Sequence, residues 1–308
     1  MKTDSPELSI QLTELRRRQL PCGGWAALVS SRQASIEATC LAALALGLDD
    51  KDTRRRAQEF LLGEQNPNGS WPAFLGDDRD GAWLTSLGLI VLRDVPMATR
   101  ATQAGIRWLA ACQGKESSWF WKWKFRTADR HVRFDPEKSG WPWLPDTCSW
   151  VVPTAFAILA LSPLRCSCAS LKEIGARVDR GIAMLIDRAC PGGGWNAGNG
   201  VVYGAALLPH PDDTAIALLS LCNRTRHPIL ERSLKWLEQM ALTLTAPWSL
   251  SWAILALAAY GLDFVPLISS LLALPGLSPC NDTSTLAVVC LATNSYSALA
   301  ALGVNTWP

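Results

Sequence analysis

Apolar residues gather along this chain in runs of about ten, and more polar segments separate the runs. Within each run nearly every position is apolar or small, so no polar stripe is left for solvent. A helix that is apolar all round has to be buried on every side. We therefore predict six buried helices, at 37–46, 83–92, 152–161, 213–221, 251–259 and 282–291.

The segments between these runs carry most of the charge and repeat apolar residues at helical spacing. Amphipathic helices of this kind bury one face and leave the other in solvent. They are expected at 8–19, 53–65, 99–113, 171–188, 229–240 and 265–274. Because six amphipathic helices alternate with six buried ones, we predict an all-α (α/α)6 toroid, with the buried helices inside and a central cavity where their N-termini converge. One such domain would cover residues 1–308.

A Trp-rich insertion at about 115–147 interrupts this alternation between the second and third buried helices. It opens with aromatic and basic residues at 119–125 and is too long for a simple turn. We expect either a flap that plugs the end of the barrel or part of the wall of an aromatic cavity.

The turns between outer and inner helices share a second pattern. Gln can cap a helix end, Gly takes a tight turn, and Trp packs over the junction. These residues are therefore expected to be structural. The copies are Gln19-x-x-x-Gly23-x-Trp25, Gln65-x-x-x-Gly69-x-Trp71, and a variant without Gln that ends in Gly193-x-Trp195.

Turns of the form Q-x-x-x-G-x-W that join α/α hairpins resemble those of the squalene-hopene cyclase and protein-prenyltransferase β-subunit superfamily. The resemblance extends over nearly the whole chain and implies the toroid fold. It does not fix the chemistry, because functional sites are grafted onto folds.

The composition of the chain limits the kinds of molecule that it is expected to bind. The net charge of +2 gives no electrostatic footprint for nucleic acid. Fifteen Trp against three Tyr either fill the core or line a cavity whose π faces can stabilise a cation. Between 239 and 281 the only charged residue is Asp263, as in membrane sequences. Several Pro and Gly residues cut this stretch, so buried helices are favoured over a face that dips into a membrane.

Ten cysteines without paired metal spacing predict free, buried thiols in a reducing cytosol. We accordingly expect a cytoplasmic protein, with contact at the membrane surface as a further expectation.

The strongest candidate chemistry lies in His210-Pro211-Asp212-Asp213-Thr214-Ala215. It resembles the Asp-x-Asp-Asp-Thr-Ala motif of class II terpene cyclases, with His210 in place of the first Asp. The resemblance implies that Asp212 is the general acid that protonates an alkene, while Asp213 and His210 hold and polarise it. Adjacent carboxyls raise one pKa, which keeps a proton available.

The same residues also suit simple helix capping, because carboxylates favour the positive end of a helix dipole. Both interpretations stay open at this point. A cyclase would further need rings around the migrating cation. Five rings are the candidate substrate-binding residues: Trp83, Trp143, Trp150, Trp195 and Tyr203.

A second hypothesis is zinc-dependent prenyl transfer. The related prenyltransferases bind zinc through Asp-x-Cys and a later His, which here suggests Asp146, Cys148 and His210. A third is a protein without catalysis that binds isoprenoid lipids or serves in an assembly. The leading hypothesis is a class II-like isoprenoid cyclase that needs no cofactor. Family cyclases pair this barrel with a second one, whereas this chain has room for one. The chain would therefore work alone, as a homodimer or with a partner subunit.

Overall fold

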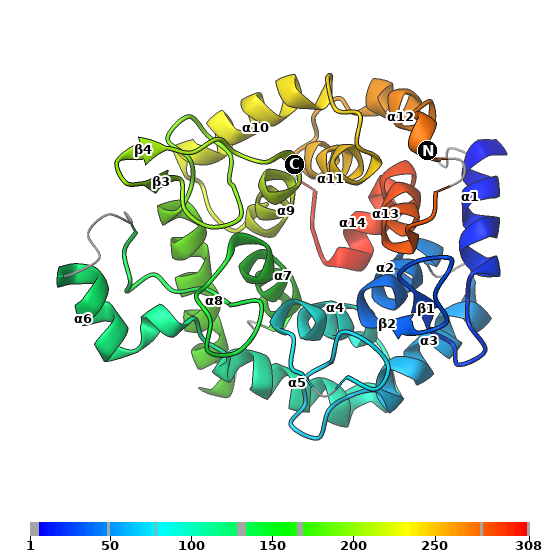
Figure 1. Ribbon diagram of the computed structural model, residues 1–308, viewed down its shortest axis with the longest axis horizontal. Coiled ribbons are helices and arrows are strands. Elements are labelled where there is room, and N and C mark those ends of the chain that lie inside the picture. The colour runs from blue at the N-terminus through cyan, green and yellow to red at the C-terminus, as the bar shows by residue number, and fades with distance from the viewer. Residues whose placement is uncertain are drawn as a thin grey trace.

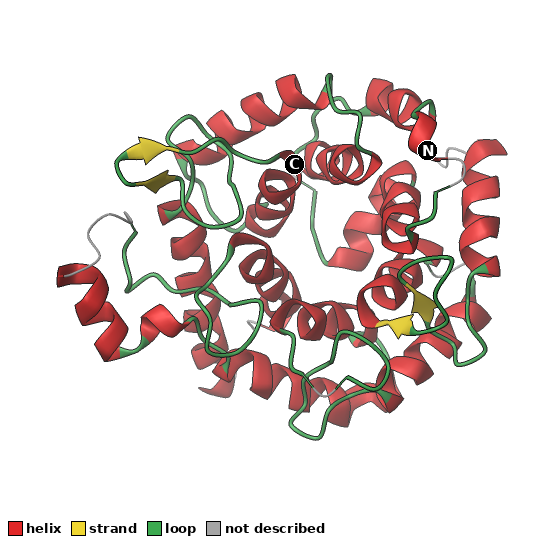
Figure 2. Cartoon of the chain, in the orientation of Figure 1, coloured by secondary structure: helices red, strands yellow, loops and turns green. Residues whose placement is uncertain are grey.

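The computed structural model describes residues 6–47, 50–77, 79–127, 134–164, 169–277 and 280–306. Its helices form two concentric rings, as Figure 1 shows in the view down the shortest axis. Figure 2 shows that helices make up most of the described chain and that the few strands are very short.

Six helices form the inner ring. Each packs on the next in the order α2, α4, α7, α9, α11, α13, and α13 returns to α2 to close the circle. Their bounds are α2 (Ile36–Leu46), α4 (Ala82–Leu92), α7 (Val151–Leu161), α9 (Pro211–Leu221), α11 (Pro247–Ala259) and α13 (Thr283–Thr293).

Six amphipathic helices surround them and turn one face to solvent. They are α1 (Pro6–Arg17), α3 (Lys51–Gly63), α5 (Thr99–Ala111), α8 (Ala169–Asp187), α10 (Pro228–Ala241) and α12 (Val265–Leu272). The predicted (α/α)6 toroid is confirmed. The inner helices are buried on all sides because their residues beyond the first turn are apolar or small. The inner ring is therefore the core of the molecule.

The remaining elements lie in connections. Helix α6 (Trp119–Thr127) belongs to the insertion, and α14 (Ser295–Leu302) follows the last inner helix. Single turns of 3-10 helix are η1 (Pro96–Ala98), η2 (Lys115–Ser117), η3 (Ser162–Leu164) and η4 (Pro275–Leu277). Two antiparallel hairpins pair β1 (Trp25–Ala26) with β2 (Ala34–Ser35) and β3 (Val201–Val202) with β4 (Ala205–Ala206).

The turn tryptophans hold the outer ring to the inner ring, as the sequence predicts. The indole Nε1 of Trp25 donates to Leu15 O at 2.7 Å, and that of Trp71 donates to Leu61 O at 2.7 Å. Trp195 makes the same bond to Leu185 O at 2.6 Å. Each ring is fully buried.

The insertion hides a further copy of this turn. Trp141 is fully buried and donates from Nε1 to Leu109 O at 2.7 Å, so it occupies the place of the other turn tryptophans. The chain between Gly114 and Gly140 leaves and returns at one point, where Gly114 N donates to Gly140 O. The insertion therefore interrupts a turn, and the helix α6 projects from the ring (Figure 1).

The two ends of the barrel differ. The connections that precede α2, α4, α7 and α9 are long, whereas the inner helices are followed by short turns. Helix α14 packs against α2, α4, α11 and α13 at the end with the short turns. Within the described residues no single helix combines the length and apolar character that a membrane crossing needs; α13 and α14 pass together but are bent by 110°.

Candidate active site

A threonine near the start of four inner helices fixes their register. The backbone N–H of each turn tryptophan donates to this hydroxyl: Trp25 to Thr39, Trp71 to Thr85, Trp141 to Thr154 and Trp195 to Thr214, at 2.8–3.0 Å. Equivalent positions can therefore be compared across the ring by counting from the threonine.

The residue two positions before each threonine is partly exposed at the start of its helix. In α2, α4 and α7 it is the only residue of the helix that is not buried. In α9 it is partly exposed, while the residues from 213 onward are buried. We call this the mouth position, and it is occupied by Glu37, Trp83, Val152 and Asp212.

Asp212 and Asp213 therefore have different surroundings although they are neighbours in sequence. Asp212 is half-buried at the mouth position, whereas Asp213 takes the next, buried position, and only 12% of its side chain is exposed. Burial raises the pKa of the Asp213 carboxyl, the hydrogen bond from His210 lowers it, and the nearby charge of Asp212 raises it; the net direction is upward. The Asp213 carboxyl thus holds its proton more firmly than an ordinary aspartate does.

His210 lies on the solvent side of this pair and contacts Asp213. Its Nδ1 lies 2.8 Å from Asp213 Oδ2, and 57% of its side chain is exposed. His210 is the N-cap residue of α9, and Asp213 lies in the first turn. Their contact therefore also stabilises the N-terminus of the helix. The structure thus brings together all three residues predicted for proton transfer, with His210 on the solvent side.

A second acidic group, which the sequence analysis did not single out, also occupies the mouth. Burial raises the pKa of Glu37 to about 7, and the charge of Asp282 adds to the rise. Asp282 is the N-cap residue of α13, the helix beside α2 where the ring closes. The Glu-x-Thr spacing at 37–39, which equals Asp-x-Thr at 212–214, is the signal that could have found it.

Aromatic rings form an unbroken chain of contacts inside this end of the barrel. Trp143 meets Trp83 with 5.5 Å between ring centroids, and Trp83 meets Phe156 at 5.9 Å. Phe156 meets Trp252 at 5.9 Å, and Trp252 meets Trp248 at 5.8 Å. This series of ring contacts runs from α4 through α7 to α11. Helices α7 and α11 lie on either side of α9, and α4 is the next helix beyond α7.

Two of these rings meet across the inside of the ring of helices, at the level of the second turn of α7 and α11. Phe156 on α7 and Trp252 on α11 are each 1% exposed and touch one another, although α9 lies between their helices in the ring. Phe156 follows the mouth position of α7 by four residues, and Trp252 follows the equivalent position of α11, Trp248, by four. Four residues correspond to about 6 Å along a helix axis. The two rings therefore form part of the packed core one helical turn below the level of Asp212.

The predicted ring residues do not all lie together. Trp83 and Trp143 touch at the mouth. Trp195 is fully buried as a turn tryptophan, so it leaves no surface for a ligand. Tyr203 lies at the tip of the β3–β4 hairpin and is 77% exposed. Trp150 lines a separate pocket beside the hairpin.

The residues predicted for zinc are not gathered into a metal site. Cys148 and His210 line the same pocket, but Asp146 is not among its lining residues. Across the described parts of the chain, no three His, Cys, Asp or Glu side chains are grouped so that they could hold a metal ion. The donor set therefore does not fit zinc, and we derive no step through it. The eight described cysteines are free; Cys166 and Cys168 lie outside the described residues.

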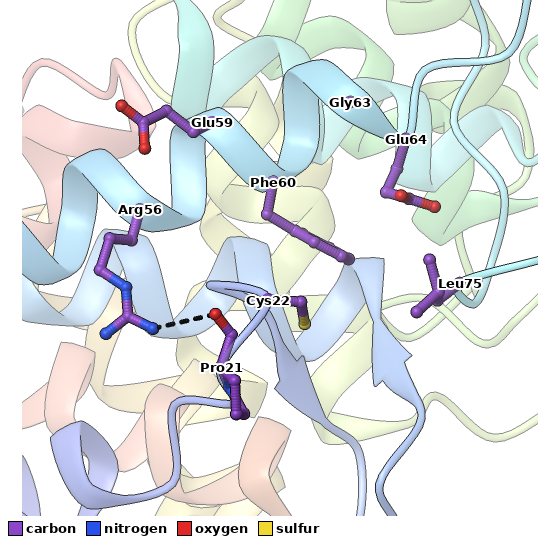
Figure 3. A pocket seen from close by; sticks show the side chains of 8 residues that line it. All are labelled: Pro21, Cys22, Arg56, Glu59, Phe60, Gly63, Glu64 and Leu75. Carbon is purple, nitrogen blue, oxygen red and sulfur yellow. Dashed lines mark hydrogen bonds between the residues drawn. The ribbon is translucent and has the colours of Figure 1, made fainter.

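A smaller pocket of about 360 Å³ lies on the outside of the ring, between the first turn and α3 (Figure 3). Arg56 donates there to the carbonyl oxygens of Leu20 and Pro21, at 3.1 and 3.3 Å. Its guanidinium group therefore holds the turn against α3.

The Squalene-hopene cyclase C-terminal domain family matches residues 10–209 of the 308. The chain belongs to this family. The matched segment ends directly before His210, so family membership does not itself cover the acidic motif. No curated protein sequence matches the chain.

Solved structures share the fold at low sequence identity. The type II terpene cyclase MstE from Scytonema has a TM-score of 0.55 at 16% identity, over 87% of this chain and 80% of that chain. A novel alpha-amylase from Clostridium perfringens scores 0.63 at 10% identity (96% and 99%). The endo-beta-1,4-glucanase CMCax from Acetobacter xylinum scores 0.59 at 14% identity (97% and 99%). These likenesses show the toroid alone, and the site must decide the chemistry.

Proposed function

We propose that this chain is a class II-like isoprenoid cyclase that begins its reaction by protonating a carbon–carbon double bond at the mouth of the barrel. The observation that carries the proposal is the placement of Asp212. It occupies the mouth position, its neighbour Asp213 is buried with a raised pKa, and the helices on either side of α9 carry aromatic rings that touch one another. Family membership supports the same conclusion.

In the proposed step, the Asp212 carboxyl gives its proton to the less substituted carbon of the terminal double bond of the isoprenoid. The π electrons form the new C–H bond and leave a tertiary carbocation, which the next double bond attacks to close a ring. A final C–H bond gives up its proton to a carboxylate or to water, so the proton count balances. Asp213 and His210 orient the acid, and the rings stabilise the cation and exclude water.

The open end of the barrel also suits an apolar substrate. Its connections expose large apolar side chains at Leu28, Val29, Phe74, Leu75 and Leu144, each 40–49% exposed. Exposed apolar groups gathered at one end mark an interaction surface. We propose that this end contacts a membrane surface, from which a water-insoluble isoprenoid can enter directly; sedimentation with phospholipid vesicles would check this contact.

The test uses purified protein with squalene and, separately, geranylgeranyl diphosphate, followed by analysis for cyclic products. We expect turnover by the native chain and a loss of at least a hundredfold for Asp212→Asn, because the amide has no proton to give. Asp50→Asn is the matched control. Asp50 also caps a helix, but at the opposite end of the barrel, so it should keep full activity.

Two other results would overturn the proposal. Turnover that survives Asp212→Asn would show that another group starts the reaction. Release of sugar from a glucan, with no cyclic product from either isoprenoid, would place the chain with the glycosidases that share its fold.

A further inference from the structure

A pocket of about 780 Å³ lies between the insertion, the β3–β4 hairpin and the C-terminal end of the outer helix α8. In Figure 1 the hairpin and α6 lie on the same side of the ring, beyond α8. The volume is within the roughly 300–1,000 Å³ that small-molecule sites occupy. The pocket touches the candidate active site at His210, whose ring lines it while also bonding Asp213.

Most of the wall is apolar. Aromatic and aliphatic side chains come from the insertion, from the segment before α7 and from the hairpin. They are Phe125, Phe134, Trp150, Val202, Leu207 and Leu208. A wall of this composition binds the hydrocarbon part of a ligand through burial of apolar area.

Two buried polar atoms among the lining residues have no partner. Arg188 is 3% exposed, and its Nη1 and Nη2 donate to Ser149 O at 2.7 Å and Glu116 Oε1 at 2.8 Å. Its Nε, however, has no acceptor in the described structure, and Asn199 Oδ1 has no donor. Buried polar groups are nearly always hydrogen-bonded, because leaving one unpaired is costly. Arg188 and Asn199, which both line the pocket, thus each keep one hydrogen-bonding atom that no group in the described structure uses.

The charge of the arginine is already balanced. Glu116 is fully buried and lies 2.8 Å from Arg188, so the floor of the pocket carries an ion pair with no net charge. A phosphate or carboxylate would be placed beside the Glu116 carboxylate. A neutral hydroxyl can instead accept a hydrogen bond from one partner and donate to the other.

We propose that this pocket binds a neutral amphiphile, with its apolar body against the aromatic and aliphatic wall and its single hydroxyl group between Arg188 Nε and Asn199 Oδ1. The proposal does not rest on the cyclase function, because it concerns binding alone.

Two cysteines allow a direct test. Cys148 lines the pocket and is half-buried, whereas Cys22 is exposed on the outside of the ring. The full chain is labelled with N-ethylmaleimide, and the labelling rate at each cysteine is read from peptide masses. The probes are 1-dodecanol, dodecane and dodecyl phosphate, each below its aggregation limit. We expect dodecanol to slow labelling of Cys148 at least fivefold and to leave Cys22 unchanged.

Variants separate head-group recognition from simple exclusion. Ala206→Trp fills the pocket and should abolish protection by dodecanol, whereas Ala205→Trp, on the opposite face of the same strand, should retain it. Arg188→Lys keeps a cation for Glu116 but removes Nε and the second terminal nitrogen. It should raise the dodecanol concentration for half protection about three- to tenfold, the effect of one hydrogen bond.

The inference fails if dodecanol gives no protection, if dodecane protects equally well, or if Arg188→Lys has no effect. Tighter protection by dodecyl phosphate would replace the neutral head group with an anionic one. Because no product is measured, these outcomes are independent of the Asp212→Asn result.

Discussion

Replacing Glu37 with Gln should stabilise the protein by an amount that grows as the pH rises from about 4.5 to 7 and then stays constant. In the folded state burial raises the pKa of this carboxyl from an ordinary 4.5 to about 7. The folded state therefore binds the proton more tightly than the unfolded chain does. The contribution of the protonated group is fully present below pH 4.5 and is lost as the pH rises through 7.

The size of the effect follows from the two pKa values. Each pH unit of difference corresponds to about 1.4 kcal/mol, so an ionised Glu37 costs the folded state up to about 3 kcal/mol at pH 8. Gln has nearly the same shape and carries no charge, so Glu37→Gln avoids this cost. At pH 4.5 the native side chain is largely protonated, and the two proteins should differ by less than about 1 kcal/mol.

Urea unfolding between pH 4.5 and 8 measures the difference. The stability gap should open from near zero to about 3 kcal/mol across this range. Glu238→Gln, on the exposed face of α10, is the control and should show no such opening. A gap that is equal at both ends of the range, or a variant less stable than the native chain at pH 8, would refute a dry carboxyl at the mouth.

Two further predictions concern the acid pair and a turn. The hydrogen bond from His210 lowers the pKa of Asp213, so His210→Ala should raise it and move the high-pH decline of product formation to higher pH; a move to lower pH would contradict this. Gly69→Ala should cost about 3 kcal/mol or more in urea unfolding, because φ is +99° and a Cβ would lie 2.6 Å from the Ala104 carbonyl. Gly76→Ala, at φ +83° in open space, should cost only about 1 kcal/mol; equal costs would refute the clash.

Most of the fold could be predicted because its signals are local. Runs of apolar residues mark the inner helices, and the predicted runs at 83–92 and 152–161 begin one residue inside α4 and α7. The start of α11 was placed four residues late, at 251 instead of 247. Pro247 opens the first turn there, where the missing N–H has no intrahelical partner, and partly exposed residues follow.

The third turn escaped prediction because the insertion separates its parts. Leu109 and Trp141 are 32 residues apart, compared with 10 for the other turn tryptophans and their carbonyl partners. No pattern with fixed spacing finds such a pair. Helix α14 was not predicted either, since it follows the last apolar run after a sharp bend.

The candidate site was predictable only where a motif carries it. Asp212, Asp213 and His210 lie within one helical turn, so sequence alone brings them together. Glu37 and Asp282 become neighbours only when the last inner helix closes the ring against the first. The pocket behind His210 likewise depends on two loops that meet in space.

Turnover in D2O tests the central claim most directly, because the starting proton of the proposed reaction comes from an exchangeable carboxyl. The account predicts one deuterium in each cyclic product molecule, on the carbon that begins the cascade, and no labelled product from Asp212→Asn. A cyclic product that forms in D2O without deuterium would contradict protonation by Asp212.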